Sequence, residues 1–283
     1  MSCVPMPADA RHTSDFTEDA VLGKLQEQQD DPADFNATTW LHGARLTWDT
    51  LDGALTQSVD ASRNETHRID DSPLSFFTTD NLGETITYSY KGTYRFDVPV
   101  GLGLHNAITW LVEDEKERFT PNSVFVDPFF GFKDDGFARV RNDIAYAGEW
   151  RGDVADRLFV TAGVRHDDND TFEDFTTWRT TATLLLPEIG LRPHGSAGTA
   201  VKAPTMFEQY GTIPLRFTPN PALVPEESFG WDAGLELASR DRRHWVDVTY
   251  FEADLENQIN GFAPGPNFTF TAVNRDGNGT PAW

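Results

Sequence analysis

The stretch that decides the fold is ITYSYKGTYRFDV, residues 86–98. Its residues alternate between an apolar and a polar set: Ile86, Tyr88, Tyr90, Gly92, Tyr94, Phe96 and Val98 against Thr87, Ser89, Lys91, Thr93, Arg95 and Asp97. A period of two predicts a β-strand with two unlike faces. A strand of this length rises about 43 Å at roughly 3.3 Å per residue, so even when tilted by about 40° it can cross an apolar band of roughly 25 Å. The strand is therefore long enough to span a membrane.

The same alternation recurs along the chain, at 104–112, 138–150, 158–164 and 246–250. No position on the apolar parity of these strands carries a charge, although charged residues make up 24% of the sequence. Lys or Arg facing lipid costs roughly 2 to 4 kcal/mol at the midplane, so an uncharged face is what a membrane wall requires. Weaker patterns predict further strands at 38–50, 54–65, 175–186, 191–202 and 231–239.

Short and long connections alternate between these strands. Short turns are expected at 51–53, 99–101, 151–156, 187–190 and 239–243, and longer connections at 67–84, 114–136, 167–174, 204–229 and 257–270. Membrane barrels place tight turns on one side and extended loops on the other. We therefore predict an all-β fold, an antiparallel up-and-down meander of about ten or eleven long strands that forms an open, strongly curved sheet, an incomplete transmembrane β-barrel. Residues 1–37 are polar and are expected to form a loop or a disordered segment, and residues 38–283 to form the partial barrel.

Composition excludes some classes of protein. The net charge of −22 argues against a nucleic-acid partner, because phosphate needs a basic surface. No run of about 18 apolar residues predicts a transmembrane helix. The sequence shows no signal peptide, so a membrane protein of this kind is expected to be a fragment of a longer chain.

Three ordered motifs carry a resemblance to a known family. They comprise Lys202, Ala203 and Pro204, then Asn220, Pro221, Leu223, Pro225 and Glu226, then Gly234, Leu235 and Glu236. With this order the sequence resembles the C-terminal half of the barrel of TonB-dependent outer-membrane receptors, closely over about 190–260. The prolines mark where strand pairing stops and restarts, and we interpret them as loop punctuation without ligand contact.

The resemblance implies an outer-membrane receptor and transporter of a Gram-negative bacterium, not an enzyme, with no cofactor. It implies energy-coupled uptake of a ferric siderophore, cobalamin or similar bulky nutrient, with membrane lipid around the barrel. A TonB-type energising protein would act only through a plug domain, which this sequence lacks, so the fragment alone is not expected to transport. The expected lumen-facing residues are Lys91, Arg95, Arg139, Arg141 and Arg165.

Other chemistry has little support in the sequence. The seven histidines show no metal-ligand spacing, and neither a nucleotide-binding motif nor a catalytic nucleophile is recognisable. Acidic residues at 167–174 and the DGNG at 276–279 could bind calcium, but solvated loops are the favoured interpretation. In the expected loop 114–136 four phenylalanines could form a substrate or partner site, or could pack on each other or on the barrel rim: Phe125, Phe129, Phe130 and Phe132.

Two alternatives remain open. A passive porin-like barrel would share the strand pattern but would lack the motif series in residues 194–237. A soluble all-β binding module, such as a sandwich or a propeller, would bury the uncharged faces in a core.

Overall fold

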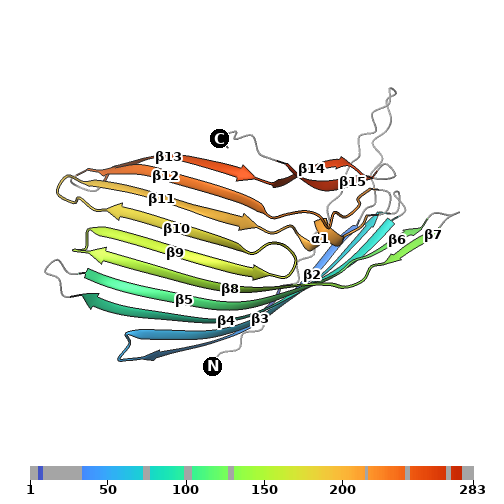
Figure 1. The fold of residues 1–283 in the computed structure, drawn as a ribbon, viewed down its shortest axis with the longest axis horizontal. Helices are drawn as coiled ribbons and strands as arrows, with labels where there is room; N and C mark the ends of the chain where they lie inside the picture. Colours follow the sequence, from blue (N-terminus) through green and yellow to red (C-terminus); the bar gives the residue numbers. More distant parts are fainter. Residues whose placement is uncertain are drawn as a thin grey trace, which may run out of the picture.

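A computed structural model describes residues 6–8, 34–72, 77–98, 104–126, 131–213, 216–239, 243–265 and 269–275. Within them the chain forms one thirteen-stranded antiparallel sheet, a separate two-stranded sheet and a short helix (Figure 1). The strands of the large sheet are β1 (Met6–Ala8), β2 (Asp34–Thr50), β3 (Leu55–Ser72), β4 (Phe77–Val98), β5 (Leu104–Thr120), β6 (Asn122–Val126), β7 (Gly131–Asp135), β8 (Arg139–Val154), β9 (Leu158–Asn169), β10 (Phe175–Leu184), β11 (Leu191–Lys202), β12 (Glu226–Ala238) and β13 (Trp245–Glu256). The helix is α1 (Met206–Tyr210), and β14 (Gln258–Pro264) pairs with β15 (Phe270–Arg275).

The large sheet is an up-and-down meander, as predicted. Neighbours in sequence pair from β1 to β5 and from β8 to β13, while β6 and β7 form a hairpin that branches from β4. Ten of the strands are ten or more residues long, within the predicted number. The described strands do not close into a ring, because β1 and β13 are the two ends of the path. The fold is thus an open, curved sheet (Figure 1).

The strands run further than the apolar alternation indicates. Residues 67–84, expected to be a long connection, are mostly paired strand in β3 and β4. Polar side chains join the strands there: His67 Nε2 lies 2.6 Å from Asp80 Oδ1, and Thr78 donates to Asp71 Oδ1 at 2.7 Å. Polar cross-strand pairs of this kind stabilise strand pairing even where the sequence shows no alternating apolar face. Similarly, the expected connections contain the β6–β7 hairpin, α1 and β14, while β15 begins at residue 270, where the last of these connections was expected to end.

The N-terminal part of the chain differs from the expectation in two places. Strand β2 begins at Asp34, four residues before the predicted start, and Met6–Ala8 pair with Thr39–Leu41. The remainder of the expected polar segment, residues 1–5 and 9–33, lies outside the described residues.

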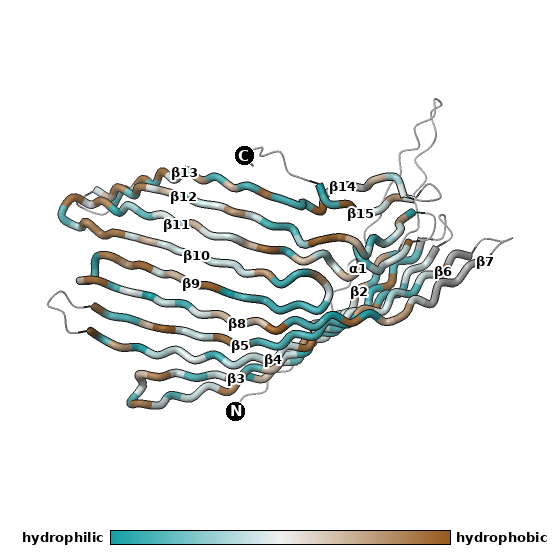
Figure 2. Tube along the Cα trace, viewed as in Figure 1, coloured by the Kyte–Doolittle hydropathy of each residue, from teal (hydrophilic) through white to brown (hydrophobic). Residues whose placement is uncertain are grey.

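The two faces of the sheet differ in polarity across many strands. One register row joins Leu46, Val59, Tyr90, Val112 and Tyr146 on five successive strands, and most of these side chains are exposed. We call the face of this row the apolar face, and the opposite side the polar face. Figure 2 shows hydrophobic and hydrophilic residues alternating along the strands.

Burial in this sheet is the reverse of that in a water-soluble protein. Among the described residues, the buried hydrophobic side chains are few: Phe119, Ala145, Met206, Phe217, Leu223 and Ala272. Many large apolar side chains are exposed instead, including Leu46 in β2 and Tyr250 in β13. In the part of the chain that the structure describes, no helix is long and apolar enough to cross a membrane.

Candidate binding site at the loop end of the sheet

Helix α1 lies at the end of the sheet opposite the short turns (Figure 1). Its start is fixed by a capping box: Thr205 Oγ1 accepts from the Glu208 backbone N–H at 3.2 Å, and the Thr205 N–H donates to Glu208 Oε2 at 2.8 Å. It ends at Gly211, where a Cβ would lie 2.3 Å from the Phe207 ring. A larger residue at this position would therefore have to displace the Phe207 ring.

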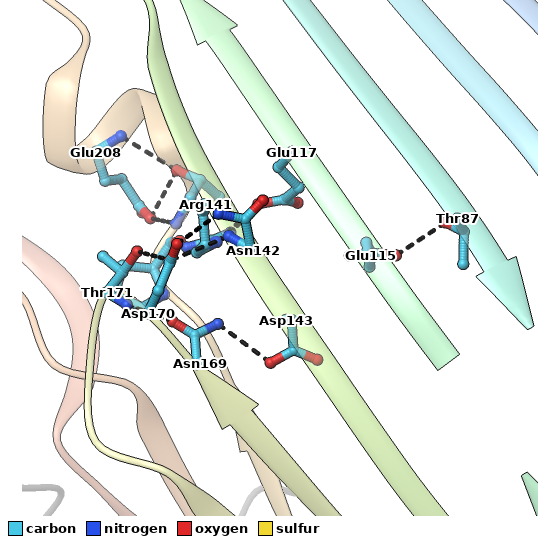
Figure 3. A network of polar contacts seen from close by, with 12 residues as sticks. Thr87, Glu115, Glu117, Arg141, Asn142, Asp143, Asn169, Asp170, Thr171 and Glu208 are labelled. Carbon is cyan, nitrogen blue, oxygen red and sulfur yellow. Dashed lines mark hydrogen bonds and ion pairs between the residues drawn. The ribbon is translucent and has the colours of Figure 1, made fainter. Parts of the chain in front are cut away.

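Arg141 fastens the segment before α1 to the polar face. Arg141 is 8% exposed, and its Nη1 donates to the Pro204 carbonyl at 3.0 Å. Its Nε donates to Glu117 Oε2 at 2.8 Å, and its guanidinium lies 5.6 Å from the Phe172 ring. Figure 3 shows this group of polar side chains between the strands and the helix. One cation thus connects β5, β8 and the chain that leads into α1.

An aromatic cluster packs beneath the same segment. The Phe207 ring stacks on Phe217 at 5.4 Å and meets Phe119 edge-on at 6.4 Å between ring centroids. Phe217 belongs to a small core with Leu223 and Ala272, on which Phe207, Ile213 and Ile259 also pack. This core joins α1, the loop after it and the β14–β15 hairpin into one folded unit at the end of the sheet.

The motif residues hold this unit together. Asn220 donates its backbone N–H to Glu208 O at 3.0 Å and its side-chain amide to Ala272 O at 2.9 Å. Glu226 Oε1 lies 3.2 Å from Lys202 Nζ and accepts from the Ile259 N–H at 2.8 Å. Pro204 is fully buried.

A hollow of about 200 Å³, which we call the loop-end hollow, opens between the base of the β6–β7 hairpin and the C-terminal end of α1. Its lining includes Ser123, Phe137, Arg139, Gln209, Tyr210 and Pro221. Gln209 is 1% exposed, and its Oε1 accepts no hydrogen bond from the described residues. The Arg139 guanidinium lies 5.4 Å from the centre of the Tyr210 ring.

All five residues expected to face a lumen lie on the polar face. Lys91 and Arg165 share one register row, through Leu111 and Ala147, and line a shallow hollow of about 380 Å³ in the middle of the sheet. Arg95 donates to Thr56 Oγ1 at 2.9 Å. Arg139 and Arg141 reach the loop-end unit instead, so the structure divides the set between two places.

Only two of the four phenylalanines of the predicted site lie within the residues that the structure describes. Phe125 of β6 and Phe132 of β7 are cross-strand partners in the hairpin, whereas Phe129 and Phe130 lie outside the described residues. A ligand role for the four residues stays a prediction.

The acidic segment after β9 is held by its own hydrogen bonds. Asp170 accepts from the Asn142 backbone N–H at 3.0 Å and from its amide at 2.6 Å, as Figure 3 shows. Partial burial acts to raise the pKa of Asp170, but these bonds and one from Thr171 outweigh it and lower the pKa. Across the described ranges, no group of three or more His, Cys, Asp or Glu side chains is placed to hold a metal ion, and residues 276–279 lie outside those ranges.

The sequence interpretation missed Gln209, Tyr210 and the aromatic cluster. The one local pattern that could have located them is Thr205-x-x-Glu208, a capping box followed by a glycine three residues later. It lies in a stretch that the interpretation treated as a long connection.

The family model for the TonB dependent receptor-like beta-barrel matches residues 6–280, so the chain belongs to this family. Its members are receptors and transporters of the outer membrane of Gram-negative bacteria, not enzymes, which confirms the predicted class.

Solved structures share the fold at low identity. The copper transporter OprC is 14% identical with a TM-score of 0.65, over 85% of this chain and 42% of that chain. The ferric-catecholate import receptor Fiu from K12 E. coli is 13% identical with a TM-score of 0.59, over 86% and 44%. The siderophore receptor PirA from Pseudomonas aeruginosa is 16% identical with a TM-score of 0.53, over 86% and 52%. The chain thus spans about half the length of these structures or less.

Proposed function

We propose that these residues form part of the wall of an outer-membrane receptor that takes up a scarce, bulky nutrient with energy coupling. The observation that carries the proposal is the pair of unlike faces, apolar and mostly exposed on one side and polar with charged residues on the other, across the central parts of β2, β3, β4, β5 and β8. A soluble module would bury the apolar side, and here that side is exposed.

In this proposal the apolar face contacts outer-membrane lipid and the polar face lines the lumen. Lys91 and Arg165 then face water or a plug in the middle of the wall, and Arg95 lies nearer the short turns. The exposed apolar side chains supply the area that a barrel presents to the hydrocarbon.

The nutrient we propose is a metal chelate such as a ferric siderophore, or cobalamin. The similar proteins named above are a copper transporter, a ferric-catecholate import receptor and a siderophore receptor, and the loop-end unit would select among such ligands. A TonB-type protein would act through a plug domain and not through this wall, so these 283 residues alone would not carry out coupled transport.

The test is uptake by cells that produce the protein containing this chain, compared with cells from which its gene is deleted. Radiolabelled ferric siderophores and cobalamin are supplied with and without a proton uncoupler. We expect uptake of one of these ligands that saturates, needs the gene and stops with the uncoupler. Gene-dependent entry that does not saturate and resists the uncoupler would contradict the proposal and favour a passive pore.

A further inference from the structure

We propose that the loop-end hollow binds a single hydroxylated ring of monosaccharide size. The inference rests on the proposed function, because it names a chemical group of the nutrient that the loop end would hold. The hollow is formed by the junction of β5 with β6, the junction of β7 with β8, and the end of α1 with the loop after it. The sequence analysis predicted no ligand-binding role for any residue that lines the hollow.

The first argument is the acceptor in the wall of the hollow. Gln209 Oε1 is buried and accepts no hydrogen bond from the described residues. A buried acceptor without a donor costs about 1 to 3 kcal/mol, so the site favours a ligand that brings an O–H or N–H group. The Ser123 hydroxyl, which is also buried in the lining, can both donate and accept.

The second argument is the flat apolar surface at the rim. Phe137 is 80% exposed, an unusual position for a phenylalanine, and Tyr210 presents a second ring. Together with Pro121, Pro219 and Pro221, these rings offer surfaces on which the C–H faces of a saturated ring can pack. The lining is therefore amphipathic, as a ring that carries both C–H and O–H groups requires.

The third argument is charge. Arg139 is the one charged residue among the described residues of the lining, and its guanidinium already lies over the Tyr210 ring. A multiply charged anion would find a single cation among these residues, whereas a neutral hydroxylated ring finds the Gln209 acceptor and the Ser123 hydroxyl, which can both donate and accept. The volume of about 200 Å³ holds one such ring and not a whole bulky nutrient.

The floor of the hollow is close-packed, which fixes its size. A Cβ added at Gly136 would lie 2.4 Å from the Pro121 carbonyl oxygen, so the two chain segments touch there. Gly211 likewise fixes the end of α1 that carries Gln209 and Tyr210, because its backbone N–H donates to the Phe207 carbonyl at 2.7 Å. The site is therefore built on local structure that forms without a ligand.

The experiment measures binding of methyl glucoside, methyl galactoside and methyl mannoside to the full chain by saturation-transfer NMR, with catechol as an aromatic probe. The chain is refolded in a polyoxyethylene detergent, because a maltoside detergent would compete. Phe137→Ala and Gln209→Met remove the rim ring and the acceptor. Thr177→Val, which lines the hollow in the middle of the sheet, is the matched control.

We expect saturable binding of at least one glycoside. Phe137→Ala and Gln209→Met should each weaken it roughly threefold to tenfold, and Thr177→Val should change it less than about twofold. Because Phe137 is exposed, its variant tests the site even if the Gln209 variant does not fold.

Three results would overturn the inference: no saturable glycoside binding by the folded chain, equal binding by Phe137→Ala and Thr177→Val, or catechol binding without glycoside binding. Such a result together with saturable, uncoupler-sensitive uptake would remove this inference and leave the proposed transport intact. Glycoside binding together with uncoupler-resistant uptake would remove the transport proposal alone.

Discussion

At the scale of single residues, Arg141 connects the wall to the segment that leads into α1. It joins Glu117 of β5 to the carbonyl of Pro204, and it is almost fully buried. The sequence analysis predicted from the alternation along the strand that Arg141 faces a lumen. Alternation predicts the face of the sheet on which a side chain lies, but not the residues that it contacts. The partner Pro204 is 63 residues away in sequence, a separation that no local pattern can bridge.

Arg141→Met should lower the free energy of unfolding by about 2 kcal/mol, because it leaves the Glu117 carboxylate and the Pro204 carbonyl without their donor. The measurement is urea unfolding of the chain in detergent micelles, followed by tryptophan fluorescence. Arg179→Met is the control, since Arg179 has no ion pair within the described residues. Equal loss in the two variants would contradict a special role for Arg141.

A second residue-scale prediction concerns pH. The hydrogen bond from Arg157 is the main cause that lowers the pKa of Glu188, and the two side chains join two short turns. Because the folded-state pKa lies below the ordinary value of about 4.3, the pair stabilises the fold above that pH and is lost as pH falls through the lowered pKa.

Arg157→Met should therefore lower the unfolding midpoint at about pH 7 and have no effect at about pH 2.5. High salt should reduce the difference at neutral pH, because the pair is exposed. A difference that persists unchanged at low pH would count against the ion pair as its cause.

At the scale of elements, the sequence predicted the central parts of the strands and missed their polar extensions. In β4 the alternation of residues 86–98 locates the strand, but β4 begins at Phe77, and residues 77–85 do not alternate between apolar and polar. The sequence analysis did not mistake these strands for helices, because the alternation of apolar and polar residues continued over many positions. Helix α1 was missed because five residues carry too little periodicity.

The turn between β8 and β9 gives an element-scale prediction. Ala155 and Asp156 lie in this three-residue turn, and both have positive φ, 56° and 54°, a conformation that suits glycine or asparagine. Asp156→Gly should stabilise the chain by about 1 kcal/mol, because a left-handed conformation costs roughly 1 to 2 kcal/mol for other residues.

Gly190→Ala is the matched opposite case and should destabilise. Gly190 has a φ of 68°, and an added Cβ would lie 2.3 Å from the Ala238 carbonyl oxygen. Urea unfolding of both variants measures the two effects. Stabilisation by Gly190→Ala, or destabilisation by Asp156→Gly, would show that these turns differ from the structure described here.

At the scale of the whole molecule, the sheet ends in an exposed edge. Every residue of β13 is exposed, including Trp245, Val248 and Tyr250, and within the described residues no strand pairs with its outer side. An unpaired apolar edge is a template for association, so the 283 residues alone should aggregate in water and require detergent or lipid. The sequence predicted this open sheet, because the number of expected strands is too small for a closed barrel of the family. It could not predict where the loop-end unit lies, because that depends on contacts between residues far apart in the sequence.

The most direct test of the account is the environment of two adjacent positions in β8, Tyr146 on the apolar face and Ala147 on the polar face. Each is replaced by cysteine in a Cys3→Ser background, labelled with an environment-sensitive fluorophore and reconstituted in lipid vesicles. The account predicts that the label at 146 is quenched by quenchers on lipid chains and the label at 147 by aqueous iodide. Equal access of iodide to both positions would contradict a lipid-facing wall.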